Sequence, residues 1–346
     1  MGFFSNNNVQ NITIGSNAKY LNNSMSNAFR NCRMINSPIN IPRGVTSIAY
    51  AFSNCTNFNS HVFIPNSVTN TQSPFQGCTN FNTSPTIENG IDKLYFLLGS
   101  CSTYNSNLTI PNSVTSLMYV FDSCGNYNQV LTIPNGVTAL RGLFRQCIRY
   151  NQPITIPESV TDCSYLFDAC TNYNKPTTIP NGTLTIDMMF NGCANFNQPV
   201  SIPNTVTKAS KTFSNCGNFN QKIVVPDSVQ NIDNMCYNCG NLNSEQIIGT
   251  GVQSLRQVYY NCKNFASNIY IYANNISSAY QMLYNHNNSK RINIMIPANS
   301  STQMINAFKV ANTQSIVGAS ISFASNVSNK CVLYNATRNI YIYNNL

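Results

Sequence analysis

Cysteine is the residue type whose spacing in this sequence first suggests chemistry. Cys recurs every 23 residues at eleven positions, from Cys32 to Cys262. Regularly spaced thiolates could bind metal ions, which need clustered Cys or His ligands, or could pair as disulfides. Stacked side chains one repeat apart point in parallel rather than toward each other, which disfavours disulfides. Because each Cys has apolar neighbours, we interpret the column as small, buried hydrophobic residues.

Asn forms a second column with the same period, running from Asn36 to Asn243. A side-chain amide can bond to the backbone of its own turn and to that of the next repeat. We therefore predict an internal ladder that satisfies buried turn groups, with sugar binding by the same amides as the alternative.

An aromatic column, from Phe58 to Phe219, precedes each Asn. We interpret it mainly as core, with a binding stripe as the alternative.

Hydroxyl residues form a fourth column, each between two apolar residues of a predicted strand. Because side chains alternate across a strand, these hydroxyls face outward. Solenoids commonly bind ligands on such extended faces, although an exposed strand also favours Thr for its β propensity. The candidate binding residues on this outward strand face are Thr109, Thr132, Thr155, Thr178 and Ser201.

Charged residues make up only 8% of the chain and are unevenly distributed. Residues 1–87 carry four basic groups and no acid, whereas residues 88–245 carry eight basic and ten acidic groups. Residues 246–346 carry seven basic groups and no acid, and no nucleic-acid-binding motif accompanies them. We expect this end to dock on an acidic protein surface, with an ordinary solvated surface as the alternative. The candidate basic docking residues are Arg256, Lys263, Lys290, Arg291 and Arg338.

Few residues offer catalytic chemistry. The chain has two His and ten acidic residues, and neither His61 nor His286 has a partner at a known motif spacing. The sequence contains no G-x-S-x-G, H-E-x-x-H or phosphate-binding loop. We therefore expect no enzymatic activity, no metal site and no cofactor.

A repeated backbone unit must position these columns. In residues 108–111, LTIP, apolar residues alternate with Thr and a Pro ends the segment, which predicts a half-buried strand. Leu117, Phe121 and Cys124 follow at i, i+4 and i+7, which predicts a short α-helical or 3₁₀ segment. Coils of this kind, with strands paired in parallel at about 4.8 Å, build a solenoid.

The ends of the 346-residue chain depart from the repeat, as the caps of a solenoid should. We predict one continuous domain with an N-terminal cap at 1–28, an eleven-coil solenoid at 29–285 and an irregular C-terminal cap at 286–346. Beyond Cys262 the phase slips, and Asn285 stands where the next Cys is due. Residues 331–346 predict two strands around a polar turn, a terminal hairpin.

The run IPRGVTSIAYAFSNCTNF at 41–58 resembles the BspA-like class of leucine-rich repeat, a 23-residue unit written IP-x-x-VT-x-I-x-x-x-AF-x-x-C-x-x-L. The pieces YNQP and NFNQP, at 150–153 and 195–199, are similar to related surface-protein repeats that carry FNQPL. The resemblance covers residues 29–285. It implies an α/β repeat solenoid, leucine-rich-repeat-like, with a parallel sheet along one face. Such repeats occur in bacterial adhesins, in lipoproteins and in bacteriophage particles.

The first residues, MGFFSNNNVQNITIGSN, show neither the basic start nor the apolar stretch of a secretory signal. We therefore expect a non-enzymatic bacteriophage virion protein, made in the host cytoplasm, that attaches or adheres through a rigid repeat face. A bacterial or protist cell-surface adhesin and a purely architectural virion subunit are the alternatives. The expected partners are other virion proteins or a host surface glycan or protein. We expect no nucleic acid and no membrane span, and a homo-oligomer is compatible with the sequence.

Overall fold

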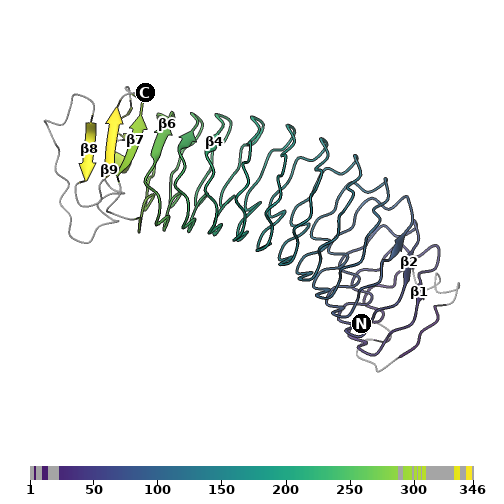
Figure 1. Cartoon of the computed structure of the whole chain (residues 1–346). Coiled ribbons are helices and arrows are strands. Elements are labelled where there is room, and N and C mark those ends of the chain that lie inside the picture. Colours follow the sequence, from purple (N-terminus) through teal and green to yellow (C-terminus); the bar gives the residue numbers. More distant parts are fainter. Residues whose placement is uncertain are drawn as a thin grey trace. The chain divides into compact units, whose positions relative to one another are not determined.

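A computed structural model of the chain describes Phe4 and residues 10–14, 23–286, 291–297, 300–301, 303–304, 306–308, 331–335 and 340–344. The chain divides into two compact units, residues 1–175 and residues 176–346, called unit 1 and unit 2 below. Each unit is a stack of similar coils, which run from purple to teal in unit 1 and from teal to yellow in unit 2 (Figure 1). The predicted solenoid with 23-residue coils is therefore confirmed.

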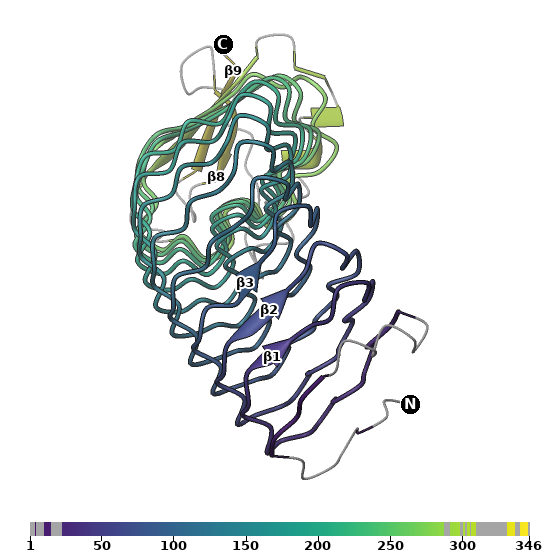
Figure 2. The same cartoon turned by 90° about the vertical axis from the view of Figure 1, so that its right-hand side faces the viewer.

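Unit 1 contains a three-stranded parallel sheet in the order β1-β2-β3. Its strands are β1 (Ile39–Asn40), β2 (Val62–Ile64) and β3 (Thr86–Ile87), which lie side by side in Figure 2. Phe63 pairs with Thr86, 23 residues later, so one strand follows the next at one coil per step.

The strand predicted at 108–111 does not form. Leu108 and Ile110 are buried on either side of the exposed Thr109, as the alternation predicts, but the segment is extended chain outside any sheet. Residues 131–133 behave in the same way. In the coil after residues 131–133, Pro153 precedes the corresponding segment. Because a proline has no N–H to donate to a strand ladder, it disfavours strand pairing there.

Unit 2 contains a six-stranded sheet in the order β4-β5-β6-β7-β9-β8. All neighbouring strands are parallel except the last pair, β8 and β9, which is antiparallel and comprises the two strands predicted in residues 331–346. The register between β6 and β7 pairs residues 25 apart, such as Ile269 with Ile294, which reflects the phase slip seen in the sequence. The strands are β4 (Ile223–Val225), β5 (Gln246–Ile248), β6 (Asn268–Ile271), β7 (Ile292–Ile296), β8 (Cys331–Asn335) and β9 (Ile340–Asn344).

The segment before each Cys is a series of turns, and the predicted helical segment is wrong. The N–H of Ala51 bonds to the carbonyl of Ile48 in its own coil, but the N–H of Phe52 bonds to the carbonyl of Pro74 in the next coil. A helix would keep both bonds within the segment. Hydrogen bonds that alternate within and between coils therefore replace the helix and join neighbouring coils.

Two residues of each turn segment adopt a left-handed backbone, which explains the frequent Asn and Gly there. Asn54, for example, has a φ of 61°. Gly142, also at 61°, has a second reason to be glycine, because a Cβ at this position would overlap the ring of Tyr119 from the preceding coil. The turns thus restrict which residue types fit at these positions, both through the left-handed backbone and through the room left for a side chain.

Aromatic side chains fill the interior of both units. In unit 1 the ring of Phe121 stacks on Tyr127 with centroids 4.0 Å apart, and Tyr127 stacks on Tyr150 at 5.9 Å. Tyr127 and Tyr150 are fully buried, and among the described residues their hydroxyls have no hydrogen-bond partner. The aromatic column is core, as predicted, and does not form the alternative binding stripe.

Candidate functional site

The outward strand face predicted to bind a ligand is exposed in both units. Its five candidate residues are all solvent-exposed. Within the described part of the chain, none of their hydroxyls has a hydrogen-bond partner, which leaves these groups available to a ligand. Three of them, Thr109, Thr132 and Thr155, lie in unit 1, and Thr178 and Ser201 lie in unit 2.

The strand face becomes apolar within the sheet of unit 2. Val224 takes the place of the hydroxyl residue and is 50% exposed, and Ile247 and Tyr270 follow it in register across β5 and β6. A hollow of about 330 Å³ on this sheet is lined by Asn268, Tyr270, Arg291, Asn293, Met295 and Tyr343. This change was not predicted from the sequence, although the apolar residues at the Thr position were the signal for it.

The predicted basic docking end is only partly described. Lys290 and Arg338 lie outside the described residues, whereas Arg256, Lys263 and Arg291 are exposed. Arg256 lies in the turns, 5.7 Å from the ring centroid of Tyr280, and Lys263 directly follows Cys262. Arg291 precedes β7 and donates from Nε to Oδ1 of Asn293 at 2.8 Å. The three cations occupy different positions around the coil, so docking of this end remains a prediction.

The Asn column serves the neighbouring coil, as predicted, but it is not internal. The Oδ1 atom of Asn36 accepts the backbone N–H of Asn59 at 2.8 Å, and Asn59 accepts from Asn82 in the same way. These side chains are exposed rather than buried. Two further amide ladders in unit 2 run through Asn215, Asn238, Asn261 and Asn285 and through Asn195, Asn218, Asn241 and Asn264.

The Cys column is core. The thirteen cysteines from Cys32 to Cys262 are reduced and buried. The Sγ of Cys147 donates to the carbonyl of Phe121, 26 residues earlier, at 3.1 Å, and the same bond recurs along the column. Burial raises the pKa of the Cys147 thiol well above its usual range, so the thiolate needed for metal binding is disfavoured. The thiols therefore help to join the coils.

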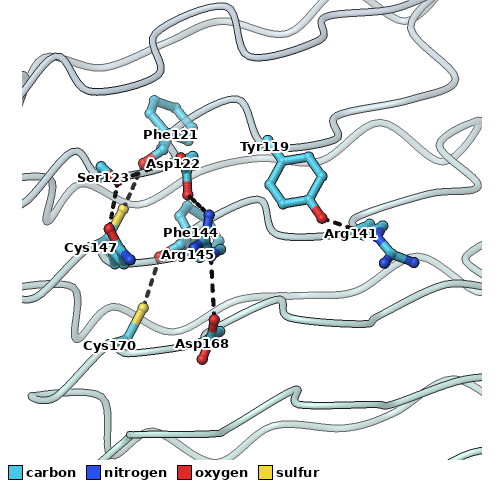
Figure 3. A network of polar contacts seen from close by, with 11 residues as sticks. Tyr119, Phe121, Asp122, Ser123, Arg141, Phe144, Arg145, Cys147, Asp168 and Cys170 are labelled. Carbon is cyan, nitrogen blue, oxygen red and sulfur yellow. Dashed lines mark hydrogen bonds and ion pairs between the residues drawn. The ribbon is translucent and has the colours of Figure 1, made fainter. Parts of the chain in front are cut away.

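One charged network, in unit 1, was not found from the sequence. The guanidinium of Arg145 lies between the carboxylates of Asp122, at 3.1 Å, and Asp168, at 3.3 Å (Figure 3). The three residues are spaced 23 apart, which was the available signal. Burial raises the pKa of Asp122 although Arg145 opposes the shift. Beside the network, Arg141 donates to the hydroxyl of Tyr119 at 3.1 Å (Figure 3).

Other groups capable of chemistry are dispersed. His61 contacts the Thr86 hydroxyl at 2.9 Å, and His286 is buried against the carbonyl of Leu283. Among the residues placed by the structure, no group of three or more His, Cys, Asp or Glu side chains could hold a metal ion. The helices found in that same part of the chain are too short or too polar to cross a bilayer.

Two protein-family models match the sequence. "BspA type Leucine rich repeat region (6 copies)" matches residues 1–118 and 209–343. The chain belongs to the BspA-type leucine-rich repeat family. "Mycoplasma protein of unknown function, DUF285" matches residues 92–182 and 157–250. The comparison with curated proteins finds no match.

Several solved structures are similar to this chain, and that of PcpA supports the solenoid fold. The pneumococcal vaccine antigen PcpA is 16% identical with a TM-score of 0.51, and the match covers 81% of this chain and 75% of that one. A leucine-rich repeat protein from Bacteroides ovatus is 18% identical with a TM-score of 0.47, covering 79% and 82%. A leucine rich cell surface protein from Faecalibacterium prausnitzii is 21% identical with a TM-score of 0.46, covering 76% and 82%.

Proposed function

We propose that this BspA-type chain is a non-enzymatic adhesion protein that binds a surface ligand through the outward strand face of its coils. The unpartnered hydroxyls of that face carry the proposal. The Asn amides and Cys thiols form hydrogen bonds between coils, whereas the hydroxyls of Thr109, Thr132 and Thr155 make none to any residue that the structure describes. Each exposed hydroxyl offers a weak contact, and several on a rigid support gain strength when many copies are displayed together.

We further propose that the two units form one continuous solenoid, because the 23-residue period continues from Cys170 to Cys193. In this proposal residues 1–28 and 286–346 cap its ends. The proposed setting is a bacteriophage particle, with a bacterial or protist cell surface as the alternative. Mass spectrometry of purified particles and of cell-envelope fractions separates the two settings, because the chain should be enriched in only one of them.

A cell-binding assay tests adhesion itself. Purified full-length chain, made tetravalent with a fluorescent scaffold, is incubated with a panel of bacterial and animal cells and counted by flow cytometry. Saturable binding to at least one cell type, competed by unlabelled chain, is the expected result. Binding to purified phage particles alone would favour the architectural alternative, and binding to neither would contradict adhesion.

A further inference from the structure

A ladder of stacked tyrosines in the turns of unit 2 ends at a hollow. Tyr237 stacks on Tyr260 with ring centroids 4.7 Å apart and planes 7° from parallel, and Tyr260 stacks on Tyr284 at 4.8 Å. The preceding coil carries Ser214 in the same column, 23 residues before Tyr237. Because serine is small, the outer face of the Tyr237 ring has no aromatic neighbour from that coil.

The hollow lies against both Tyr237, the first ring of the ladder, and Ser214 in the coil before it. Its volume is about 400 Å³, within the range of small-molecule sites. Tyr237 and Ser214 line it together with one cation, Lys211, and a set of side-chain amides. The remaining lining residues are Met188, Asn191, Asn215, Asn234 and Gln257.

The polar groups of this hollow are held in place and still have bonding capacity. Asn234 donates from Nδ2 to Oε1 of Gln257 at 3.0 Å, and Gln257 donates to Gln281 at 2.8 Å. These bonds orient the two amides but leave the Oδ1 of Asn234 and the second N–H of each amide for a ligand. Among the described residues the half-buried Lys211 makes no ion pair with a carboxylate. The site therefore combines a flat aromatic face, oriented amides and a lysine that makes no ion pair within the described part of the chain.

We infer that this hollow binds a carboxylated pyranose sugar. The C–H face of the sugar would stack on Tyr237, as the next member of the ladder, because the face of an aromatic ring is electron-rich. Sugar hydroxyls would bond to Asn234 and Gln257, and the carboxylate would pair with Lys211. An aromatic side chain from a partner protein fits less well, because it would bury the amides and the ammonium without partners. None of the strand-face residues lines the hollow, so this site lies beyond the proposed adhesion face.

Calorimetric titration of the full chain tests this inference with two acidic probes, a galacturonate trisaccharide and sialyllactose, and their neutral counterparts, a galactose trisaccharide and lactose. We expect at least one acidic probe to bind, and its neutral counterpart to bind at least tenfold more weakly. The identity of the binding probe distinguishes a uronic acid from a sialic acid. If neither acidic probe binds, or acidic and neutral probes bind equally, the inference is wrong.

A matched pair of lysine variants locates the charge contact. Lys211→Met should weaken binding of the acidic probe about tenfold, whereas Lys208→Met, which removes an exposed lysine of the same coil outside the hollow, should leave it unchanged. Equal effects of the two variants would show that binding depends on net charge and not on this site.

Two further variants test the stacking position. Ser214→Tyr should extend the ladder, fill the hollow and abolish binding without lowering the midpoint of thermal unfolding. Tyr237→Phe, which keeps the flat face, should retain binding, and Tyr237→Ala should lose it. A folded Ser214→Tyr variant that still binds the acidic probe would place the sugar elsewhere. If either substitution impairs folding, the lysine pair decides the question alone.

Discussion

The backbone N–H of Asn128 donates a 2.8 Å hydrogen bond to the Oδ1 of Asn105, 23 residues earlier in the preceding coil. One coil later, the N–H of Asn151 donates to the Oδ1 of Asn128 at 2.9 Å. Each amide oxygen therefore satisfies the backbone of the next coil at the surface of unit 1. The abundance of Asn in this column therefore has a structural cause, because each Oδ1 accepts a backbone N–H of the next coil. This bond occupies part of the hydrogen-bonding capacity of each amide.

Removing one amide should weaken the stack. Asn128→Ala leaves the N–H of Asn151 without its acceptor, and we expect the free energy of unfolding to fall by about 1 kcal/mol. Asn128→Asp keeps an acceptor oxygen at the same position and should cost less. Urea unfolding followed by circular dichroism compares the variants. An alanine variant as stable as the original chain would show that water replaces the bond without loss.

Removing a buried hydroxyl should have the opposite effect. The hydroxyl of Tyr127 is buried without a partner, and such a group costs about 1–3 kcal/mol relative to its solvated state. Tyr127→Phe keeps the stacked ring and should raise the midpoint of thermal unfolding. The exposed Tyr272 provides a control, because Tyr272→Phe removes a solvated hydroxyl and should change little. Destabilisation by Tyr127→Phe would reveal a buried water or another partner at that hydroxyl.

The cysteines should be inert in the folded protein. Burial raises the pKa of thiols such as Cys124 and Cys147, so near pH 8 they carry no thiolate to react. A thiol reagent should label none of the thirteen buried cysteines before denaturation and all of them afterwards. Rapid labelling of the native chain would contradict their placement in the core.

A charge in the cysteine column should prevent folding. Cys147→Asp places an unpaired carboxylate in the interior, whereas Cys147→Ser keeps a donor for the carbonyl of Phe121. Expression and circular dichroism should show a folded serine variant and an unfolded aspartate variant. Two equally folded variants would place this column at the surface.

Glu88 should make the stability of unit 1 depend on pH. Its carboxylate accepts two bonds from Arg43, at 2.7 and 3.0 Å, and one from the N–H of Asn66. The Arg43 hydrogen bond is the main cause that lowers the pKa of Glu88 below 4.5. The unfolded chain therefore binds this proton more readily. The stabilisation is fully present at pH values above the pKa of Glu88 in the unfolded chain, and it is lost as the pH falls through the lower pKa of the folded state.

Thermal unfolding of Glu88→Gln tests this dependence. The variant should unfold at a lower temperature than the original chain at neutral pH, and the difference should vanish in acid. Glu158→Gln serves as the control, because Glu158 is exposed and makes no ion pair within the described residues. A difference for Glu88→Gln that stays constant with pH would show that its charge contributes nothing.

The 23-residue period predicted the coils and their core residues correctly. Leu117, Phe121 and Cys124 are fully buried, as their spacing indicates. The same spacing wrongly predicted a helical segment, because a series of turns also places these side chains inward. A hydrogen bond to the next coil decides between a helix and a series of turns. The spacing of apolar residues within one repeat does not indicate whether that bond forms.

Features that depend on contacts between repeats were harder to predict. The ladder from Asn36 to Asn243 was predicted as internal, yet its amides reach the neighbouring backbone from the surface. The ion pairs of Arg145 join residues one coil apart on either side, and a search for pairs at the repeat spacing would have found them. The hollow beside Tyr237 lies where one column changes from Ser214 to tyrosine in the next coil, a change between neighbouring repeats that the repeat pattern alone does not show.

The strand face is the centre of the proposed function, and one comparison of variants tests it most directly. Thr109→Arg/Thr132→Arg places two bulky cations on that face, whereas Asn112→Arg/Asn135→Arg adds the same charge at exposed turn positions of the same two coils. Both variants, in tetravalent fluorescent form, are compared by flow cytometry on the cells that bind the original chain. We predict that the threonine variant loses most of its binding and that the asparagine variant keeps it. Equal binding by the two variants would contradict adhesion through the strand face.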